Sequence, residues 1–235
     1  MLLTVGNPKT AKGEARGYLT AVLHLAPANV AGLGTVCPKA TAGCMATCLN
    51  TAGRGGIMPR GATTNAIQEA RKRRTAFYKL NRQGFEKALA QDIARHITRA
   101  RRAGLTPCVR VNGTSDLPGL ALAMADRFPD VQFYDYTKIP FESAKASRTR
   151  KNYHLTFSRS ESNGPDVARA LACGVNVAVV FSTGRGRPLP KTWCGARVID
   201  GDKHDLRFLD PRGVVVGLRA KGRARRDSSG FVVKV

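Results

Sequence analysis

Short apolar segments alternate with helical stretches through most of the chain, and this alternation restricts the fold more than any other feature. Strands that alternate with helices favour parallel pairing, because each helix returns the chain across the sheet before the next strand begins. We therefore predict an α/β fold, a partial or distorted (β/α) barrel with parallel strands that is TIM-barrel-like. The predicted strands are Leu19–Leu25, Cys108–Val111, Val131–Tyr136, Tyr153–Phe157, Val175–Phe181, Arg197–Ile199 and Val214–Leu218.

The helical stretches show apolar residues at a spacing of about four positions. In the predicted helix Phe85–Ala103, the residues Arg95, Arg99 and Arg102 fall on a different face from the apolar residues. The length of 235 residues suits a single α/β domain that spans residues 1–235. The predicted helices are Thr63–Leu80, Phe85–Ala103, Leu117–Arg127, Phe141–Ser147 and Pro165–Cys173.

The chain is strongly basic, with 39 Lys and Arg against 16 Asp and Glu and a formal net charge of +23. This exceeds what solubility requires and predicts a polyanionic partner, DNA or RNA, with a generally basic surface as the alternative. Residues 219–235 form a basic C-terminal segment. Within it we predict a hairpin turn or a loosely ordered arm at Arg219–Arg226. The residues expected to contact phosphates are Arg54, Arg71, Lys72, Arg73, Arg74, Arg95, Arg99, Arg102, Arg185, Arg187, Arg223, Arg225 and Arg226.

No apolar run approaches the roughly 18 to 20 residues that a membrane span needs, and the N-terminus lacks the apolar core of a signal peptide. We therefore expect a cytoplasmic protein without a membrane partner. In that compartment the six cysteines predict thiols, catalytic groups or metal ligands more than disulfides.

Three of these cysteines, Cys37, Cys44 and Cys48, lie close together in a Gly-rich stretch without helical or strand periodicity, residues 27–56. Thiolates suit iron–sulfur clusters or zinc, and the C-x6-C-x3-C spacing differs from the paired spacing of common zinc fingers. We predict a [4Fe-4S] cluster on this loop after the first strand, with zinc or no metal as alternatives. The remaining iron would face a substrate, a cofactor or a fourth ligand; Cys108, Cys173 and Cys194 are candidates, although each is better interpreted as a small hydrophobe.

Polar residues follow several predicted strands. Because the carboxyl ends of parallel strands share one edge, these residues could line one pocket beside the cysteines, although turns and helix caps also use such residues. A further acidic group, Asp200, Asp202 and Asp205, is interpreted first as a turn and second as a divalent-metal site. The candidate catalytic residues are Asn112, Asp116, Asp135, Tyr136, Lys138, Ser158 and Glu161.

The motifs resemble those of the bacteriophage gene product 88 proteins, a group without a characterised activity. This resemblance covers most of the chain and implies a phage-encoded protein that works inside an infected bacterium. The matching stretches are Cys37-Pro through Cys48-Leu-Asn-Thr-Ala-Gly-Arg-Gly55, Val111-Asn-Gly-Thr-Ser-Asp116, Phe133-Tyr-Asp-Tyr-Thr-Lys138, His154-Leu-Thr-Phe-Ser-Arg-Ser-Glu161, Val198-Ile-Asp-Gly-Asp202 and Asp205-Leu-Arg-Phe-Leu-Asp-Pro211.

More distantly, the chain is similar to radical S-adenosylmethionine enzymes, which join a three-cysteine cluster after the first barrel strand to a partial (β/α) barrel. The similarity implies S-adenosylmethionine as a candidate cofactor. The chain departs from their usual C-x3-C-x2-C spacing and shows no clear equivalent of their glycine-rich motif after the second strand.

Three functions follow from these features. The first is an iron–sulfur protein that binds nucleic acid through its basic surface. The second is a radical S-adenosylmethionine-like enzyme that uses the open iron. The third and weakest is a metal-dependent nuclease built on the acidic group.

Overall fold

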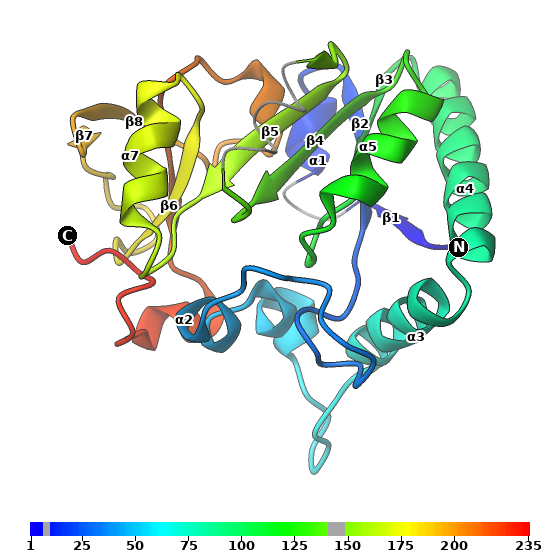
Figure 1. Ribbon diagram of the computed structural model, residues 1–235, viewed down its shortest axis with the longest axis horizontal. Helices are drawn as coiled ribbons and strands as arrows, with labels where there is room; N and C mark the ends of the chain where they lie inside the picture. The colour runs from blue at the N-terminus through cyan, green and yellow to red at the C-terminus, as the bar shows by residue number, and fades with distance from the viewer. Residues whose placement is uncertain (7–9, 141–148) are drawn as a thin grey trace.

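A computed structural model describes residues 1–6, 10–140 and 149–235 and shows a mixed α/β fold around one open sheet (Figure 1). The nine strands have the order β1-β2-β3-β4-β5-β6-β9-β8-β7. From β2 to β8 in this order all neighbours pair in parallel, while β1 and β7 add antiparallel pairs at the two ends. The strands are β1 (Leu3–Val5), β2 (Tyr18–Leu23), β3 (Thr106–Arg110), β4 (Gln132–Thr137), β5 (Tyr153–Ser158), β6 (Val177–Phe181), β7 (Thr192–Trp193), β8 (Ala196–Asp200) and β9 (Val215–Arg219).

The prediction of an α/β fold with a mostly parallel sheet is confirmed, and the open sheet is compatible with a barrel-like shape. The predicted helix Phe141–Ser147 lies outside the described residues. The sequence patterns missed β1, which precedes the expected first strand, and the short β7. The described helices are α1 (Ala11–Glu14), α2 (Ala42–Ala46), α3 (Ala66–Leu80), α4 (Arg82–Arg102), α5 (Pro118–Arg127) and α7 (Gly164–Ala172), with short 3-10 helices η1 (Leu49–Thr51), η2 (Gly53–Gly56), η3 (Arg207–Leu209) and η4 (Gly222–Arg226).

The main core lies between the sheet and helices α4 and α5. Alternate side chains of β3 and β4, such as Val109 and Phe133, point to this side and pack with Phe85 and Leu89 of α4. All four are buried, and their removal from water stabilises this layer. We call this helix-covered side of the sheet its outer face; Figure 1 shows α5 and α7 in front of it.

The opposite, inner face is covered at its amino-terminal half by the chain around η3. Leu206 packs there against Cys108 and Tyr134, and the ring of Phe208 meets the ring of Tyr18 at a centroid distance of 5.1 Å. The amino-terminal half of the inner face is therefore filled by side chains.

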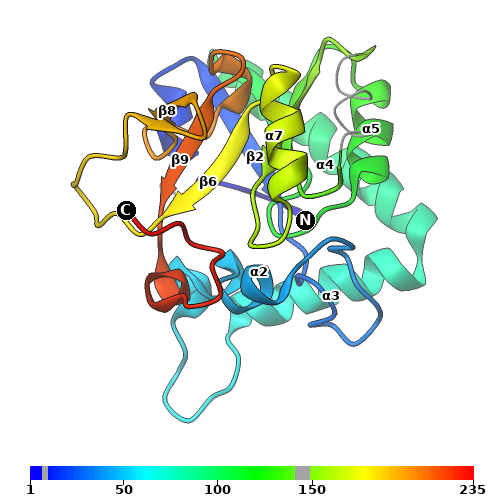
Figure 2. The same ribbon diagram turned by 60° about the vertical axis from the view of Figure 1, so that its left-hand side comes forward.

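The cysteine segment, residues 27–56, lies below the carboxyl edge of the sheet in both ribbon views (Figures 1 and 2). The sequence predicted it to be irregular, but it contains α2, η1 and η2. The C-terminal segment is not a hairpin: η4 packs against η1, and Val233 then forms a bridge with Phe181 of β6. The backbone of this segment is thus tied to the sheet and to the cysteine segment.

Candidate functional site

The three clustered cysteines converge at the carboxyl edge of the sheet. Burial raises the pKa of Cys37 to about 11, and the Cys48 and Cys44 thiols add to this rise. Burial likewise raises the pKa of Cys48, with a further contribution from Cys44. Each thiol therefore lies within electrostatic range of the other two, although they come from three different local structures.

Cys37 is held by the turn that follows β3. Its Sγ lies 3.3 Å from the Ala28 nitrogen and 3.7 Å from the Thr114 carbonyl oxygen. The Asp116 backbone N–H donates to the carbonyl of Val36 at 2.9 Å, directly before Cys37. The motif Asn112–Asp116 thus connects this cysteine to the sheet.

Cys44 lies on α2, and Glu161 from the end of β5 caps that helix. The Glu161 carboxylate accepts hydrogen bonds from Thr41 Oγ1 at 2.8 Å and from the Gly43 N–H at 2.7 Å. Burial acts to raise the pKa of Glu161, but these hydrogen bonds hold it below its ordinary value. Thr41 in turn accepts from the Cys44 N–H at 3.2 Å. The sequence prediction that Glu161 lies near the cysteines therefore matches its position.

Cys48 lies beside a buried arginine. Arg71 of α3 donates from Nη1 to Asn50 Oδ1 at 2.7 Å and to the Asn50 carbonyl at 3.2 Å. The positive charges of Lys138 and Arg71 act to lower the pKa of Cys48 against the larger effect of burial. The sequence predicted that Arg71 contacts phosphate; in this structure its side chain is buried against the cysteine segment.

A family model described as Gene product 88 matches residues 1–235. The chain belongs to this family of phage gene products. No curated protein matches the chain, and no solved structure matches it. These comparisons do not link the chain to radical S-adenosylmethionine enzymes.

Two of the candidate catalytic residues form a separate buried pair. Asp135 accepts from the Asn112 backbone N–H at 2.7 Å and from Asn112 Nδ2 at 3.1 Å. Burial raises the pKa of Asp135 to about 7 despite these hydrogen bonds. The Tyr153 hydroxyl lies 3.5 Å from the same carboxyl group. This pair joins β3 to β4 on the outer face, away from the polar residues of the inner face.

The other candidates lie at or near the carboxyl edge. Asp116 accepts from Thr137 Oγ1 and from the Lys138 N–H, each at 2.8 Å. Tyr136 belongs to the inner face, and Ser158 is half-buried at the end of β5. The structure therefore brings Asp116, Lys138 and Glu161 to the cysteine segment, while Asn112 pairs with Asp135 and Tyr136 lies on the inner face.

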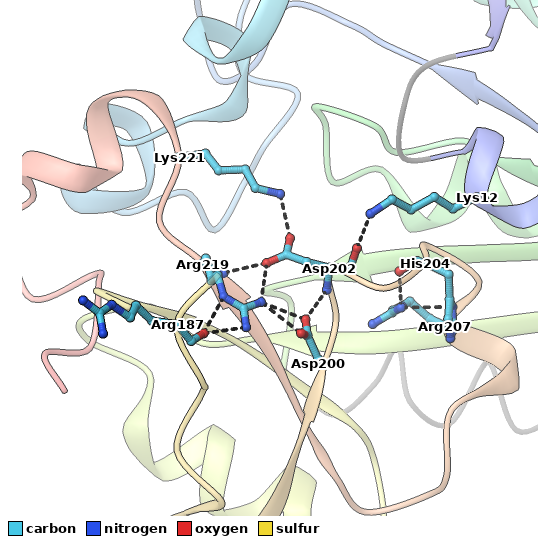
Figure 3. A network of polar contacts seen from close by, with 8 residues as sticks. All are labelled: Lys12, Arg187, Asp200, Asp202, His204, Arg207, Arg219 and Lys221. Carbon is cyan, nitrogen blue, oxygen red and sulfur yellow. Dashed lines mark hydrogen bonds and ion pairs between the residues drawn. The ribbon is translucent and has the colours of Figure 1, made fainter. Parts of the chain in front are cut away.

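The acidic group does not form a metal site. Arg219 Nη1 lies 2.9 Å from Asp200 Oδ1 and 3.3 Å from Asp202 Oδ2, and Lys221 Nζ lies 2.6 Å from Asp202 Oδ1 (Figure 3). Asp205 instead accepts from Arg110 and Tyr134 on the inner face. Across residues 1–6, 10–140 and 149–235, no three His, Cys, Asp or Glu side chains are arranged to hold a single metal ion. The geometry gives the nuclease alternative no support.

The predicted phosphate-binding residues occupy several surfaces. Lys72 and Arg74 are half-buried, and the others except Arg71 are exposed. The exposed residues comprise Arg95, Arg99 and Arg102 on α4, Arg73 on α3, Arg54 on η2, Arg185 and Arg187 after β6, and Arg223, Arg225 and Arg226 on η4.

In the part of the chain that the structure describes, no helix has the length and apolar character needed to cross a membrane.

Sequence reasoning missed three polar residues on or beside the inner face: His24, Arg110 and His154. Burial is the largest cause that lowers the pKa of His24 to about 3 and that of His154 to about 4, so both imidazoles are neutral near pH 7. The sequence did contain a signal for two of these residues. Arg110 and His154 are polar residues within otherwise apolar strands, and the residues next to them along each strand point to the outer face.

We predict that Gly43→Ala destabilises the cysteine segment. A methyl group at this position would collide with Ser229 Oγ and would lie 2.8 Å from Glu161 Oε1. The expected loss is about 1–3 kcal/mol in the free energy of unfolding, measured by urea titration. Gly119→Ala is the matched control, since a methyl group there meets no atom of the described chain within 4 Å. Equal stability of the two variants would contradict the packing described for α2.

Proposed function

We propose that Cys37, Cys44 and Cys48 bind an iron–sulfur cluster, and that this phage protein binds nucleic acid through its basic surface inside an infected bacterium. The convergence of the three thiols at one edge of the sheet carries the first part of the proposal. Three parts of the fold support that convergence through the contacts of Asp116, Glu161 and Arg71 with the cysteine segment.

We prefer a cluster to a single zinc ion because the C-x6-C-x3-C spacing differs from the paired spacing of common zinc fingers. Zinc with Zn–S bonds of about 2.3 Å would place its sulfur ligands roughly 3.8 Å apart in a tetrahedron. The three thiols of this segment influence one another electrostatically. A four-iron cluster binds each thiolate through a different iron and so needs a wider spacing.

The surroundings also suit a thiolate-bound group. Arg71 and Lys138 place positive charge near Cys48. The later cysteines lie on other elements: Cys108 on β3, 3.1 Å from Thr20 Oγ1, Cys173 at the end of α7 and Cys194 between β7 and β8. With three protein thiolates bound, one iron would be open to a substrate or cofactor.

Nucleic-acid binding is supported by the charge around the cysteine segment. The sequence has no acidic residue between Glu14 and Glu69, a range that includes the whole segment. Arg54 is exposed on η2, and the exposed arginines of η4 lie beside η1. A polyanion at this edge would therefore meet basic side chains, and the cysteine segment itself contributes no carboxylate to repel it.

We expect protein purified without oxygen to contain about four irons and four sulfides per chain. Replacing Cys37, Cys44 and Cys48 together with Ala should abolish both, because the ligands are lost. The Cys173→Ala, Cys194→Ala variant is the matched control and should keep its iron. Iron, acid-labile sulfide and visible absorption are the measurements. Colourless wild-type protein with one zinc or no metal would overturn the cluster proposal.

We expect affinity for single- or double-stranded DNA or RNA to fall steeply with added salt. Replacing Arg223, Arg225 and Arg226 with Gln should reduce the slope of log affinity against log salt by about 2, through lost phosphate contacts. The matched variant replaces Arg95, Arg99 and Arg102 on α4 and should change the slope by less than about 1. Fluorescence anisotropy of labelled oligonucleotides measures both. Affinity that does not change with salt concentration would refute the nucleic-acid proposal. Equal effects of the two variants would show that binding is not centred on η4.

A radical S-adenosylmethionine-like enzyme is the second candidate. It is favoured by one observation: β2 to β6 pair in parallel in chain order, and the cysteine segment directly follows β2, the first of these strands. In this proposal the open iron would bind S-adenosylmethionine beside Asp116, Lys138 and Glu161.

This second candidate predicts that dithionite-reduced protein releases 5′-deoxyadenosine and methionine from S-adenosylmethionine. The triple cysteine variant should release neither, since the cluster supplies the electron. Liquid chromatography with mass detection measures both products. Iron-loaded wild-type protein that releases no 5′-deoxyadenosine under reduction would exclude this activity and leave the binding proposal intact.

A further inference from the structure

The inner face of the sheet carries a group of polar side chains from three neighbouring strands. Arg110 on β3, Tyr136 on β4 and Thr156 on β5 share this face, since Tyr136 pairs with Thr156 in the sheet register. The Arg110 guanidinium carbon lies 4.5 Å from the centre of the Tyr136 ring. The three side chains are therefore contiguous.

One polar atom of each side chain is buried without a hydrogen-bond partner among the described residues. Within the described part of the chain, Arg110 Nε, the Tyr136 hydroxyl and Thr156 Oγ1 are inaccessible to solvent and make no hydrogen bond. Thr156 is 0% exposed. Leaving one buried polar group unsatisfied costs about 1–3 kcal/mol, so native proteins usually provide a partner. Three such groups on adjacent strands have no partner among the described side chains, and one bound group would satisfy all three.

The position of the group within the fold also suits a ligand. The chain around η3 fills the amino-terminal half of the inner face, where Leu206 and Phe208 pack. Tyr136 and Thr156 lie further along their strands, toward the carboxyl edge and the cysteine segment. The three groups therefore lie between these two covers.

Arg110 supplies a positively charged donor at this site. Arg110 Nη1 lies 3.3 Å from Asp205 Oδ2, which orients the guanidinium while Nε remains a donor without a protein partner. His24, at the end of β2, is within electrostatic range of Arg110, Arg71 and Arg74. Hydrogen bonds from a guanidinium to an oxyanion are stronger than those between neutral groups.

We infer that the inner face between η3 and the cysteine segment binds a small molecule through an oxyanion, a carboxylate or a phosphate group. Arg110 Nε, the Tyr136 hydroxyl and the Thr156 hydroxyl donate to its oxygen atoms. This inference does not depend on the proposed cluster, because none of the three side chains belongs to the cysteine segment.

The test measures thermal unfolding of the full chain with inorganic phosphate or acetate, against chloride at the same ionic strength. A saturable rise of about 4 °C at ten times the dissociation constant is expected for at least one of the two anions. Their relative effect identifies the group that the site prefers. An equal shift of the unfolding temperature with chloride, or no saturable shift with either anion, would overturn the inference. Water would then be the hydrogen-bond partner of the buried groups.

Two variants locate the binding. Tyr136→Phe and Thr156→Val each remove one hydroxyl that has no protein partner in the described chain, so both should fold and should bind the anion about ten-fold more weakly. Thr98→Val, at an exposed position on α4, is the control that should keep wild-type affinity. Undiminished affinity in both inner-face variants would refute the site. Iron measured in the same samples reports on the cluster separately.

Discussion

The parallel pairing of β2 with β3 is the constraint on which the rest of the structure depends. It places the ends of these strands side by side, so that the Gly113 N–H donates to the Leu23 carbonyl at 2.9 Å. The turn after β3 can then hold Cys37, while the chain that leaves β2 forms the cysteine segment. The same direction of pairing extends to β5 and brings Glu161 to α2. One topological rule thus assembles side chains that are far apart in sequence.

The two faces of the sheet perform different tasks. The outer face is largely apolar and buries Val109 and Phe133 against α4 and α5, which supplies most of the packing. The inner face carries Arg110 Nε and the hydroxyls of Tyr136 and Thr156, three buried atoms without a hydrogen-bond partner among the described residues, and such burial works against stability. Folding alone does not require polar groups there. The contrast between the faces is the basis of our proposal that the inner face binds a ligand beyond its packed amino-terminal half.

The basic residues also divide into two groups with different physical effects. Arg71 is buried, and its hydrogen bonds to Asn50 connect α3 to the cysteine segment and stabilise it. Arg54 and the arginines of η4 are exposed near the same segment and contribute to the potential that attracts polyanions. Positive charge therefore has both an internal, structural role and an external one at this edge.

The sequence by itself determined the type and approximate bounds of most elements, because apolar periodicity is a local property; α4 and β5 lie close to their predicted ranges. It also identified the three clustered cysteines and the residues at the strand ends. Only the tertiary structure decided which of these meet: Glu161 reaches α2, whereas Asp135 pairs with Asn112. It likewise placed Arg71 inside and Arg73 outside, although they are two residues apart. Contacts across strands depend on register and on the face that each neighbour covers, and neither can be read from spacing along the chain.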